Sequence, residues 1–233
     1  MSSLHLERLF QPSTVAVVGA SDGKGRIGTI LMENLMRGGF QGRLLPVNPR
    51  HREVFGLPCA PSVAHLETPV DLALIAVPMA GVPPVVGACA AAGVAAAIIV
   101  SSGGREAGAG GRAAEEAIRA AVGDRPMRLV GPNSLGLVCA PVALNASASR
   151  RLPPEGRMAF LTQSGAVYAG ILDLAARRGA GFSHVVCLGS MMDVSFAELI
   201  DHLGADPQVR AILMYAENLS RFRTFMSAAR AVS

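Results

Sequence analysis

The stretch from Thr14 to Gly28, TVAVVGASDGKGRIG, constrains the fold of this chain more than any other part. It begins with a continuous apolar run, residues 15–18, which is typical of a strand buried on both faces. A turn of small residues and glycines follows, and from Ile27 the apolar residues recur at helical spacing. Strand, turn and helix together predict the first βα unit of a nucleotide-binding fold, although a tight turn that binds no ligand gives the same pattern.

The alternation of strand and helix continues along the chain. Further apolar runs that predict strands lie at 43–47, 70–77, 95–100 and 127–130. Between them, residues 82–92 and 111–122 predict helices, the second with Glu115, Glu116 and Arg119 facing outward. Such alternation favours an α/β fold with a parallel, doubly wound sheet.

A second βα series follows the segment 147–156, SASRRLPPEG, which has no periodicity and two prolines and is predicted to be a linker. We therefore expect a first domain over 1–146 and a second over 157–233. The second series has three predicted strands, at 158–161, 184–188 and 211–215, whereas a flavodoxin-like sheet has about five. The second domain is thus expected to be truncated, either because the chain is a fragment or because another chain completes its edge. An apolar open edge would also favour a homo-oligomer.

Composition narrows the classes of ligand. Hydrophobic residues make up 51% of the chain, there is no tryptophan, and the formal charge is +4 with the basic residues dispersed. This disfavours nucleic acid as a partner. The positive charge either helps to bind an anionic small molecule or belongs to a solvated surface. The apolar stretch 82–100 is interrupted by prolines and glycines, so it is predicted to be a helix and a strand and not a membrane span.

The cysteines and the N-terminal residues favour a cytoplasmic protein. The N-terminal ten residues, MSSLHLERLF, lack the apolar core of a signal peptide. No C-x-x-C motif is present, so neither a metal site nor a redox motif is predicted. The four cysteines are far apart, at Cys59, Cys89, Cys139 and Cys187.

Three loops that follow predicted strands carry candidate ligand-binding residues. The N–H groups of the helix that begins near Gly28 are free to face phosphate. A NAD-binding unit has an acidic residue about 20 residues beyond its glycines, but here Asn48, Pro49 and Arg50 follow the second strand, which fits a phosphorylated ribose, as in coenzyme A or NADP, better. The small residues 101–104 end the fourth strand, where an open α/β sheet binds ligand.

Two further features have alternative interpretations. Glu106 follows the small-residue loop and either contacts a ligand or is a charge in the first turn of a helix. Gln163, Ser164 and Gly165 precede a helix in the second series, and they form either an anion site or an ordinary N-cap turn.

A set of motifs, taken in their order along the chain, indicates a protein family more specifically than any single motif does. They are VAVVGAS, LPVNP, DLALIAVP, the serine-rich loop before Glu106, GPNSLG, FLTQSGAV, LGSMMDV and YAENL. From about Leu6 to the end, the chain resembles the CoA-binding and first ligase domains of the nucleoside-diphosphate-forming acyl-CoA synthetases, relatives of the succinyl-CoA synthetase α subunit. GSMMDVSFAELIDHLG is most similar to the branch fused to a GNAT domain, the Pat-type protein acetyltransferases.

The resemblance implies a Rossmann-like CoA-binding domain followed by a flavodoxin-like succinyl-CoA synthetase domain, with coenzyme A or acetyl-CoA as ligand. The glycine turn would lie near the phosphates, the loops after the third and fourth strands beside pantetheine and adenine, and GPN near the thiol. Gln163, Ser164 and Gly165 would stabilise a phosphohistidine. The implied or indicated cofactor-binding residues are Gly19, Ala20, Ser21, Gly25, Gly28, Asn48, Pro49, Arg50, Val77, Pro78, Ser101, Ser102, Gly103 and Asn133.

The chain departs from the family pattern in two places. Gly189-Ser190 replaces the usual Gly-Asn pair, which fits the acetyltransferase branch. None of the five histidines has the S-H-T-G setting of the family's phosphorylated histidine, which is expected beyond Ser233, and His184 and His202 are predicted to be structural.

We therefore expect residues 1–233 to bind CoA or acyl-CoA without turnover and to contain no catalytic residue. ATP or ADP would be bound only by further domains of the same protein. Two alternatives remain open: a regulatory module that senses acyl-CoA for a protein lysine acetyltransferase, and an NADP-binding oxidoreductase domain.

Overall fold

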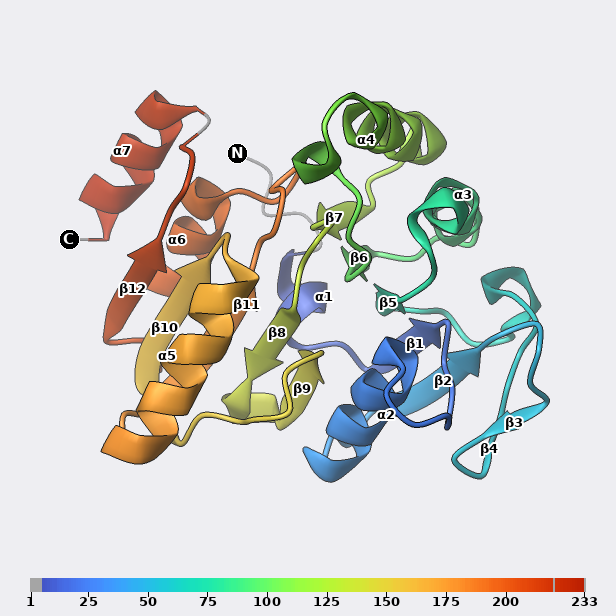
Figure 1. Cartoon of the computed structure of the whole chain (residues 1–233). Helices are drawn as coiled ribbons and strands as arrows, with labels where there is room; N and C mark the ends of the chain where they lie inside the picture. The colour runs from blue at the N-terminus through green and yellow to red at the C-terminus, as the bar shows by residue number, and fades with distance from the viewer. Residues whose placement is uncertain (1–5, 220, 233) are drawn as a thin grey trace.

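The computed structural model describes residues 6–219 and 221–232. Two five-stranded sheets lie side by side, the first built from the N-terminal half of the chain and the second mainly from the C-terminal half (Figure 1). In this part of the chain no helix has both the length and the apolar character needed to cross a membrane. Nor do three His, Cys, Asp or Glu side chains within it gather in a way that could hold a metal ion.

The first sheet is parallel throughout and has the strand order β2-β1-β5-β6-β7. This confirms the predicted doubly wound α/β fold. Its strands are β1 (Thr14–Val18), β2 (Arg43–Val47), β5 (Leu72–Ile75), β6 (Ala96–Ile99) and β7 (Arg128–Val130). A small hairpin, β3 (Glu53–Val54) and β4 (Leu57–Pro58), follows β2. Short 3₁₀ turns lie at Val63–His65 (η1), Met79–Gly81 (η2), Arg105–Ala107 (η3) and Ala140–Val142 (η4).

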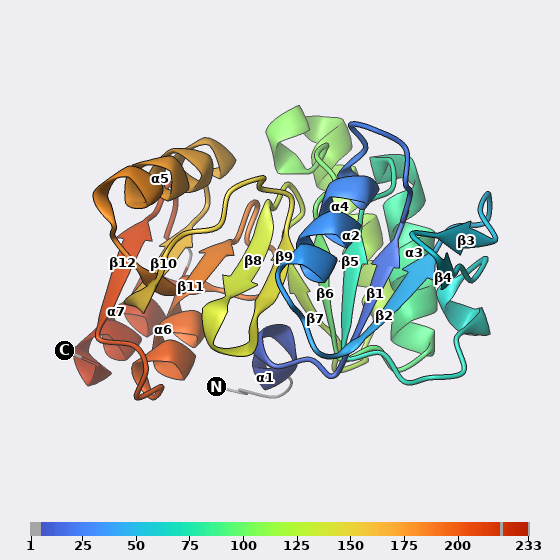
Figure 2. The same ribbon diagram turned by 90° about the horizontal axis from the view of Figure 1, so that it is seen from below.

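Helices cover both faces of the first sheet (Figure 2). Because side chains alternate along β1, Val15 and Val17 pack toward α1 (Leu6–Phe10) and α2 (Ile27–Arg37), while Ala16 and Val18 pack toward α3 (Val82–Ala91) and α4 (Ala109–Val122). One sequence-based prediction for α4 is wrong. Glu115 does not face outward but is only 2% exposed, because its carboxylate accepts hydrogen bonds from Arg105.

The second sheet is mixed and has the order β12-β10-β11-β8-β9. Its parallel strands are β10 (Glu155–Thr162), β11 (Phe182–Cys187) and β12 (Ala211–Tyr215). In the hairpin of β8 (Gly136–Cys139) and β9 (Leu144–Ser147), β8 pairs antiparallel to β11, although all of the hairpin but Ser147 lies within the range expected for the first domain. The helices α5 (Gly165–Arg178), α6 (Phe196–Gly204) and α7 (Phe222–Ala231) complete this half.

The two sheets share one hydrophobic core. Val17 of β1, Leu137 of β8, Val186 of β11 and Leu199 of α6 belong to the same cluster of buried side chains. On the other face of the second sheet, α5 covers a smaller cluster around Phe160 and Tyr168. The halves are therefore packed against each other, and the division of the chain at 147–156 stays a prediction.

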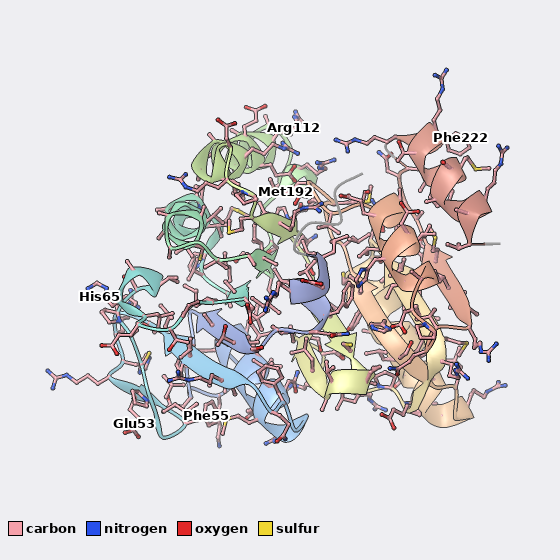
Figure 3. All side chains as sticks on the ribbon, turned by 180° about the vertical axis from the view of Figure 1, so that it is seen from behind. Glu53, Phe55, His65, Arg112, Met192 and Phe222 are labelled. Carbon is pink, nitrogen blue, oxygen red and sulfur yellow. The ribbon has the colours of Figure 1, made fainter. Side chains whose placement is uncertain are left out.

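The loop that follows β11 covers the open edge of β7. The backbone N–H groups of Ser190, Met192 and Val194 donate to the carbonyls of Pro132, Gly131 and Leu129 at 2.9, 3.3 and 3.1 Å. The partly buried side chain of Met192 packs against the core that α3 and α4 cover (Figure 3). The edge of the first sheet is thus closed by backbone pairing with the second half, which protects it from other chains.

A histidine cluster lies where α1 meets the second half. The ring of Phe10 stacks on His202 and meets His184 edge-on, with ring centroids 5.1 and 5.3 Å apart. His184 is 3% exposed, and its Nε2 lies 3.3 Å from Cys139 Sγ. His184 is thus buried in the core and the half-buried His202 packs against Phe10, in accord with their predicted structural role.

This cluster predicts a loss of stability in acid. Burial lowers the pKa of His184 and of His202, and the charge of Asp206 offsets it only in part, with Glu7 also facing His202. The folded state therefore disfavours the protonated rings, so stability is complete above the unfolded pKa of about 6.5 and falls as the pH drops below it. We expect the urea midpoint to decrease between pH 7.5 and 5.5, and to decrease less in His202→Gln. An equal decrease in both proteins would contradict this role of the cluster.

Candidate functional site

A cleft of about 860 Å³ opens at the carboxyl edge of the first sheet. This is the place where open α/β sheets bind ligands, and the volume lies within the range of small-molecule sites. The loops after β1, β2, β5 and β6 contribute to its walls, together with the first turns of α2 and α3. The lining residues are Val18, Gly19, Arg26, Ile27, Gly28, Val47, Asn48, Pro49, Arg50, Pro61, Ser62, Val63, Ala76, Val77, Pro78, Met79, Gly81, Pro84, Val85, Ala88, Ser101 and Ser102.

The N-terminus of α2 forms the polar end of the cleft. Its N-cap residue, Arg26, makes no side-chain cap. The N–H groups of Thr29 and Ile30 donate to the carbonyl of Arg26 at 3.1 Å, whereas those of Ile27 and Gly28, at the very start of the helix, remain available to an anion. The helix reaches this position because Gly28 lacks a side chain. A Cβ on Gly28 would lie 2.0 Å from the carbonyl oxygen of Gly19, which itself has a φ of +92°. The two glycines thus let the helix start directly against the end of β1.

Asn48 joins the loops after β1 and β2. Its Nδ2 donates to the carbonyl of Ala20 at 2.7 Å, and its Oδ1 accepts from the backbone N–H of Arg50 at 3.0 Å. The side chain of Arg50 is exposed at the cleft wall, as is that of Arg26. The cleft therefore has two guanidinium groups beside a helix N-terminus, an arrangement suited to phosphate groups.

The opposite wall is apolar. Val63, Val77, Val85 and Ala88 line it, and Val63 packs into the core that also contains the buried side of α3. The first turn of α3 contains Pro83 and Pro84, which have no N–H to offer an anion. This wall suits a flat or aliphatic ligand group and contrasts with the phosphate-suited end at α2.

The structure brings most of the predicted cofactor-binding residues to this one cleft. Those that line it are Gly19, Gly28, Asn48, Pro49, Arg50, Val77, Pro78, Ser101 and Ser102. Those that do not are Ala20, Ser21, Gly25, Gly103 and Asn133. Sequence reasoning missed Arg26, although its place one residue before the helical pattern was a usable signal, and it missed Ser62 and Met79, which carried none.

Three of the five residues outside the cleft have local structural explanations. Ser21 is buried, and its Oγ accepts from the backbone N–H of Gly23 at 3.0 Å. Gly103 lies beside the side chain of Met79 and donates its N–H to Glu106 at 2.7 Å. Asn133 has a φ of 57°, and its N–H donates to the carbonyl of Ser101 at 2.8 Å. Asn133 therefore lies next to the cleft through Ser101.

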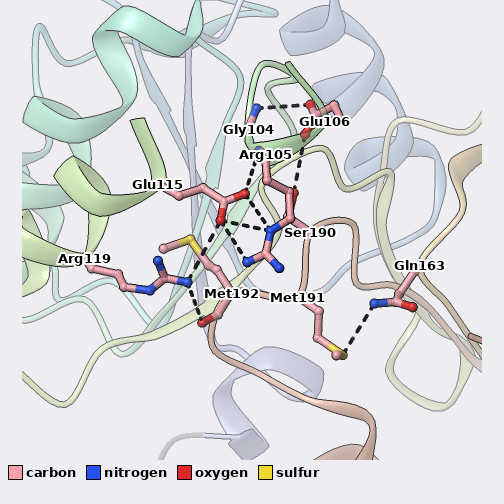
Figure 4. Close-up of polar contacts among 9 residues, drawn as sticks. All are labelled: Gly104, Arg105, Glu106, Glu115, Arg119, Gln163, Ser190, Met191 and Met192. Atoms are coloured by element: carbon pink, nitrogen blue, oxygen red, sulfur yellow. Dashed lines mark hydrogen bonds and ion pairs between the residues drawn. The ribbon is translucent and has the colours of Figure 1, made fainter. Parts of the chain in front are cut away.

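Charged side chains hold the loop after β6 in place (Figure 4). Glu106 Oε1 accepts from the N–H groups of Gly103 and Gly104, and its Oε2 lies 3.5 Å from the hydroxyl of Ser190 in the second half. Burial alone would raise the pKa of Glu115, but the hydrogen bonds and charge of Arg105 outweigh it, so that pKa is lowered. Glu106 thus acts on the loop itself, and neither carboxylate lines the cleft.

Gln163, Ser164 and Gly165 lie in the second half, at the end of β10 and the start of α5. Ser164 is the N-cap of α5, since its Oγ accepts from the N–H of Val167 at 3.3 Å. Gln163 Oε1 accepts from the backbone N–H groups of Glu217 and Asn218 at 2.8 and 2.9 Å. These contacts position the start of α5, and the role of this turn toward a phosphohistidine stays a prediction.

Comparison with known proteins identifies both halves. Residues 13–140 match the family model of the CoA binding domain, and residues 155–233 match that of the succinyl-CoA ligase like flavodoxin domain. This chain belongs to the CoA-binding-domain family. The cleft described above is therefore the carboxyl edge of its CoA-binding domain, and the predicted order of a Rossmann-like domain and a flavodoxin-like domain is confirmed.

Two relatives are named as ADP-forming acetate–CoA ligases. The chain is 40% identical to acetate–CoA ligase (ADP-forming) I of Archaeoglobus fulgidus over 228 residues, which are 98% of this chain and 33% of the relative. It is 36% identical to the α subunit of acetate–CoA ligase (ADP-forming) I of Pyrococcus furiosus, over 99% of this chain and 51% of that subunit.

A solved structure of an acetyl-coenzyme A synthetase has nearly the same fold as this chain. It is the dinucleotide forming acetyl-coenzyme A synthetase 1 of Ca. Korarchaeum cryptofilum in complex with phosphate and ADP. The TM-score is 0.94 at 36% identity, over 97% of this chain and 49% of that one.

The chain is thus homologous to the CoA-binding α-subunit portion of ADP-forming acetate–CoA ligases. It spans about a third to a half of the length of these relatives. None of the proteins named here is an oxidoreductase or a protein acetyltransferase, so neither alternative function gains support.

Proposed function

We propose that this chain is the CoA-binding portion of an ADP-forming acyl-CoA ligase and that CoA or its thioester occupies the cleft. The observation that carries the proposal is the cleft itself. One end of the cleft has a helix N-terminus and two arginines, and the other has an apolar wall. This arrangement fits a molecule that carries phosphates at one end and apolar groups at the other.

At the polar end, the diphosphate of the ligand would lie against the first turn of α2. Gly19 and Gly28 allow this approach, and the free N–H groups with the positive helix end would stabilise the charge. Arg26 and Arg50 add cations at the wall. Since Arg50 stands where a NAD-binding unit carries an acidic residue, it is our candidate for the phosphate on the ribose.

The adenine and pantetheine groups would follow the apolar wall, and the thiol would emerge near Ser101. There the loop of Asn133 meets the cleft, and the loop of Ser190 pairs with it across the junction of the two halves. The residues of this chain would bind and orient the thiol, a contribution of positioning that can account for a large part of catalysis.

Phosphoryl transfer and nucleotide binding would come from further domains or subunits, because the relatives extend well beyond the matched region. Fusion to an acetyltransferase domain, indicated by the resemblance of residues 189–204 to the Pat-type branch, stays a separate proposal. Reading the gene beyond the codon for Ser233 tests it. A GNAT domain would support the fusion, and an S-H-T-G motif with an ATP-grasp domain alone would contradict it.

Isothermal titration of the 233-residue chain tests the binding function. We expect CoA and acetyl-CoA to bind with one site per chain and NADP to bind at least tenfold more weakly. Tight binding of NADP with no heat from CoA or acetyl-CoA would reject the proposal.

Replacing Arg50 with alanine is expected to weaken CoA binding about tenfold, because one charge-assisted contact to the ribose phosphate is lost. Dephospho-CoA, which lacks that phosphate, should bind the variant and the original protein equally. Titration with both ligands measures the difference, and Arg52→Ala, an exposed arginine outside the cleft lining, is the matched control. If Arg50→Ala weakened the binding of CoA and of dephospho-CoA equally, Arg50 would not contact the ribose phosphate of CoA.

A further inference from the structure

A serine and a histidine form a hydrogen-bonded pair at the rim of the cleft. Ser62 lines the cleft, and its Oγ lies 2.7 Å from Nδ1 of His65. The backbone supports the same geometry, because Ser62 precedes the turn η1 in an extended conformation and its carbonyl accepts the N–H of His65 at 3.1 Å. The ring of His65 is exposed, and its Nδ1 is the hydrogen-bond partner that the structure shows for the hydroxyl of Ser62.

The hydroxyl of Ser62 lies on the apolar wall. η1 packs against α3, and Val63, next to Ser62, is 4% exposed within the core beneath that helix. The other described residues of this wall, such as Val77, Val85 and Ala88, offer no side-chain hydrogen-bonding group. A ligand group placed here would meet a flat apolar surface with one oriented polar oxygen.

In the tautomer in which Nδ1 of His65 carries no proton, the pair selects a ligand group that donates a hydrogen bond. When the hydroxyl donates its hydrogen bond to Nδ1 of His65, its oxygen still has lone pairs that can accept from a ligand. A heterocycle that carries an amino group fits both the apolar wall and the acceptor, whereas a carbonyl at the same position would face an oxygen with no proton to share.

We propose that Ser62, held by His65, accepts a hydrogen bond from the exocyclic amino group of adenine and makes the cleft selective for that base. The inference rests on the proposed function, since it concerns the adenine of bound CoA. Ser62 is then a specificity-determining residue and His65 a positioning residue that acts through it.

Titration with CoA and with deaminated CoA, in which hypoxanthine replaces adenine, tests the proposal. The original protein should bind CoA about tenfold more tightly than deaminated CoA, because deaminated CoA loses one hydrogen bond and places an acceptor opposite the oxygen of Ser62. Ser62→Ala should bind CoA about five- to tenfold more weakly and deaminated CoA no more weakly. Ser62→Thr keeps the hydroxyl and should restore the preference, while His65→Ala should reduce it. Ser227→Ala, an exposed serine on α7, is the control.

The outcomes separate this inference from the proposed function. If the original protein binds neither ligand, the proposed function fails and the inference fails with it. If it binds CoA but shows no preference, or if Ser62→Ala weakens both ligands equally, the function stands and the inference is wrong. Circular dichroism and the Ser62→Thr variant identify a loss of binding that comes from misfolding.

Discussion

Replacing Gly28 with alanine is expected to lower the free energy of unfolding by at least about 3 kcal/mol and to abolish CoA binding. The added Cβ would lie 2.0 Å from the carbonyl oxygen of Gly19 and 3.2 Å from Cα of Ala20, both part of the backbone. Neither atom can move without displacing the turn after β1. The start of α2 would shift away from the cleft, and the N–H groups proposed to bind phosphate would shift with it.

Urea unfolding measures the stability of the Gly28→Ala variant, and titration with CoA measures its binding where the variant remains folded. Gly170→Ala is the matched control, because Gly170 lies inside α5 with no other atom within 4 Å of an added Cβ. It should stabilise the protein by about 0.5–1 kcal/mol. A Gly28→Ala variant as stable as the original, with unchanged affinity for CoA, would show that close approach of α2 is not required.

Replacing Asp193 with alanine is expected to cost about 3 kcal/mol, the second largest effect. Asp193 Oδ2 accepts from Nε of Arg128 at 3.0 Å and from the backbone N–H of Leu129 at 2.7 Å. Burial disfavours the guanidinium of Arg128, but Asp193 and Glu198 outweigh burial and raise its pKa. Without Asp193, the half-buried cation would retain Glu198 but lose the partner that ties it to the edge of β7.

The effect of Asp193→Ala should be seen as a lower urea midpoint for both halves together, because they share one core. Asp124→Ala, at an exposed site in the loop after α4, should change the stability by less than about 0.5 kcal/mol. Loss of the second half alone, with the first half unfolding as before, would contradict the view that this contact joins the two.

The first half could be predicted from the sequence because its signals are local. The strands β1, β5 and β6 are continuous apolar runs, and each ends at glycine, proline or serine, which placed their loops at one edge of the sheet. The resulting cleft follows from topology alone, since parallel strands bring their carboxyl ends together. For this reason Gly19, Asn48 and Ser101 could be expected to lie near one another although they are far apart in sequence.

The features that could not be predicted depend on tertiary contacts. The strands β8 and β9 are four residues each, and the pairing of β8 with β11 depends on a partner more than 40 residues away. The burial of Glu115 depends on Arg105, whose guanidinium supplies its compensating charge. Nothing in the sequence around Ser62 predicts a ligand-binding residue. Its place in the cleft, on which its proposed role in recognising adenine depends, results from the packing of η1 against α3.

Hydrogen–deuterium exchange of the 233-residue chain with and without saturating CoA tests the central claim most directly, because it locates the bound molecule. We expect slower exchange on CoA binding in the segments 18–28, 47–50, 61–63, 76–88 and 101–102, which contain the residues that line the cleft, and no change in α7. Protection confined to the second half, or CoA binding without protection of the turn from Gly19 to Gly28, would contradict the assignment of this cleft as the CoA site.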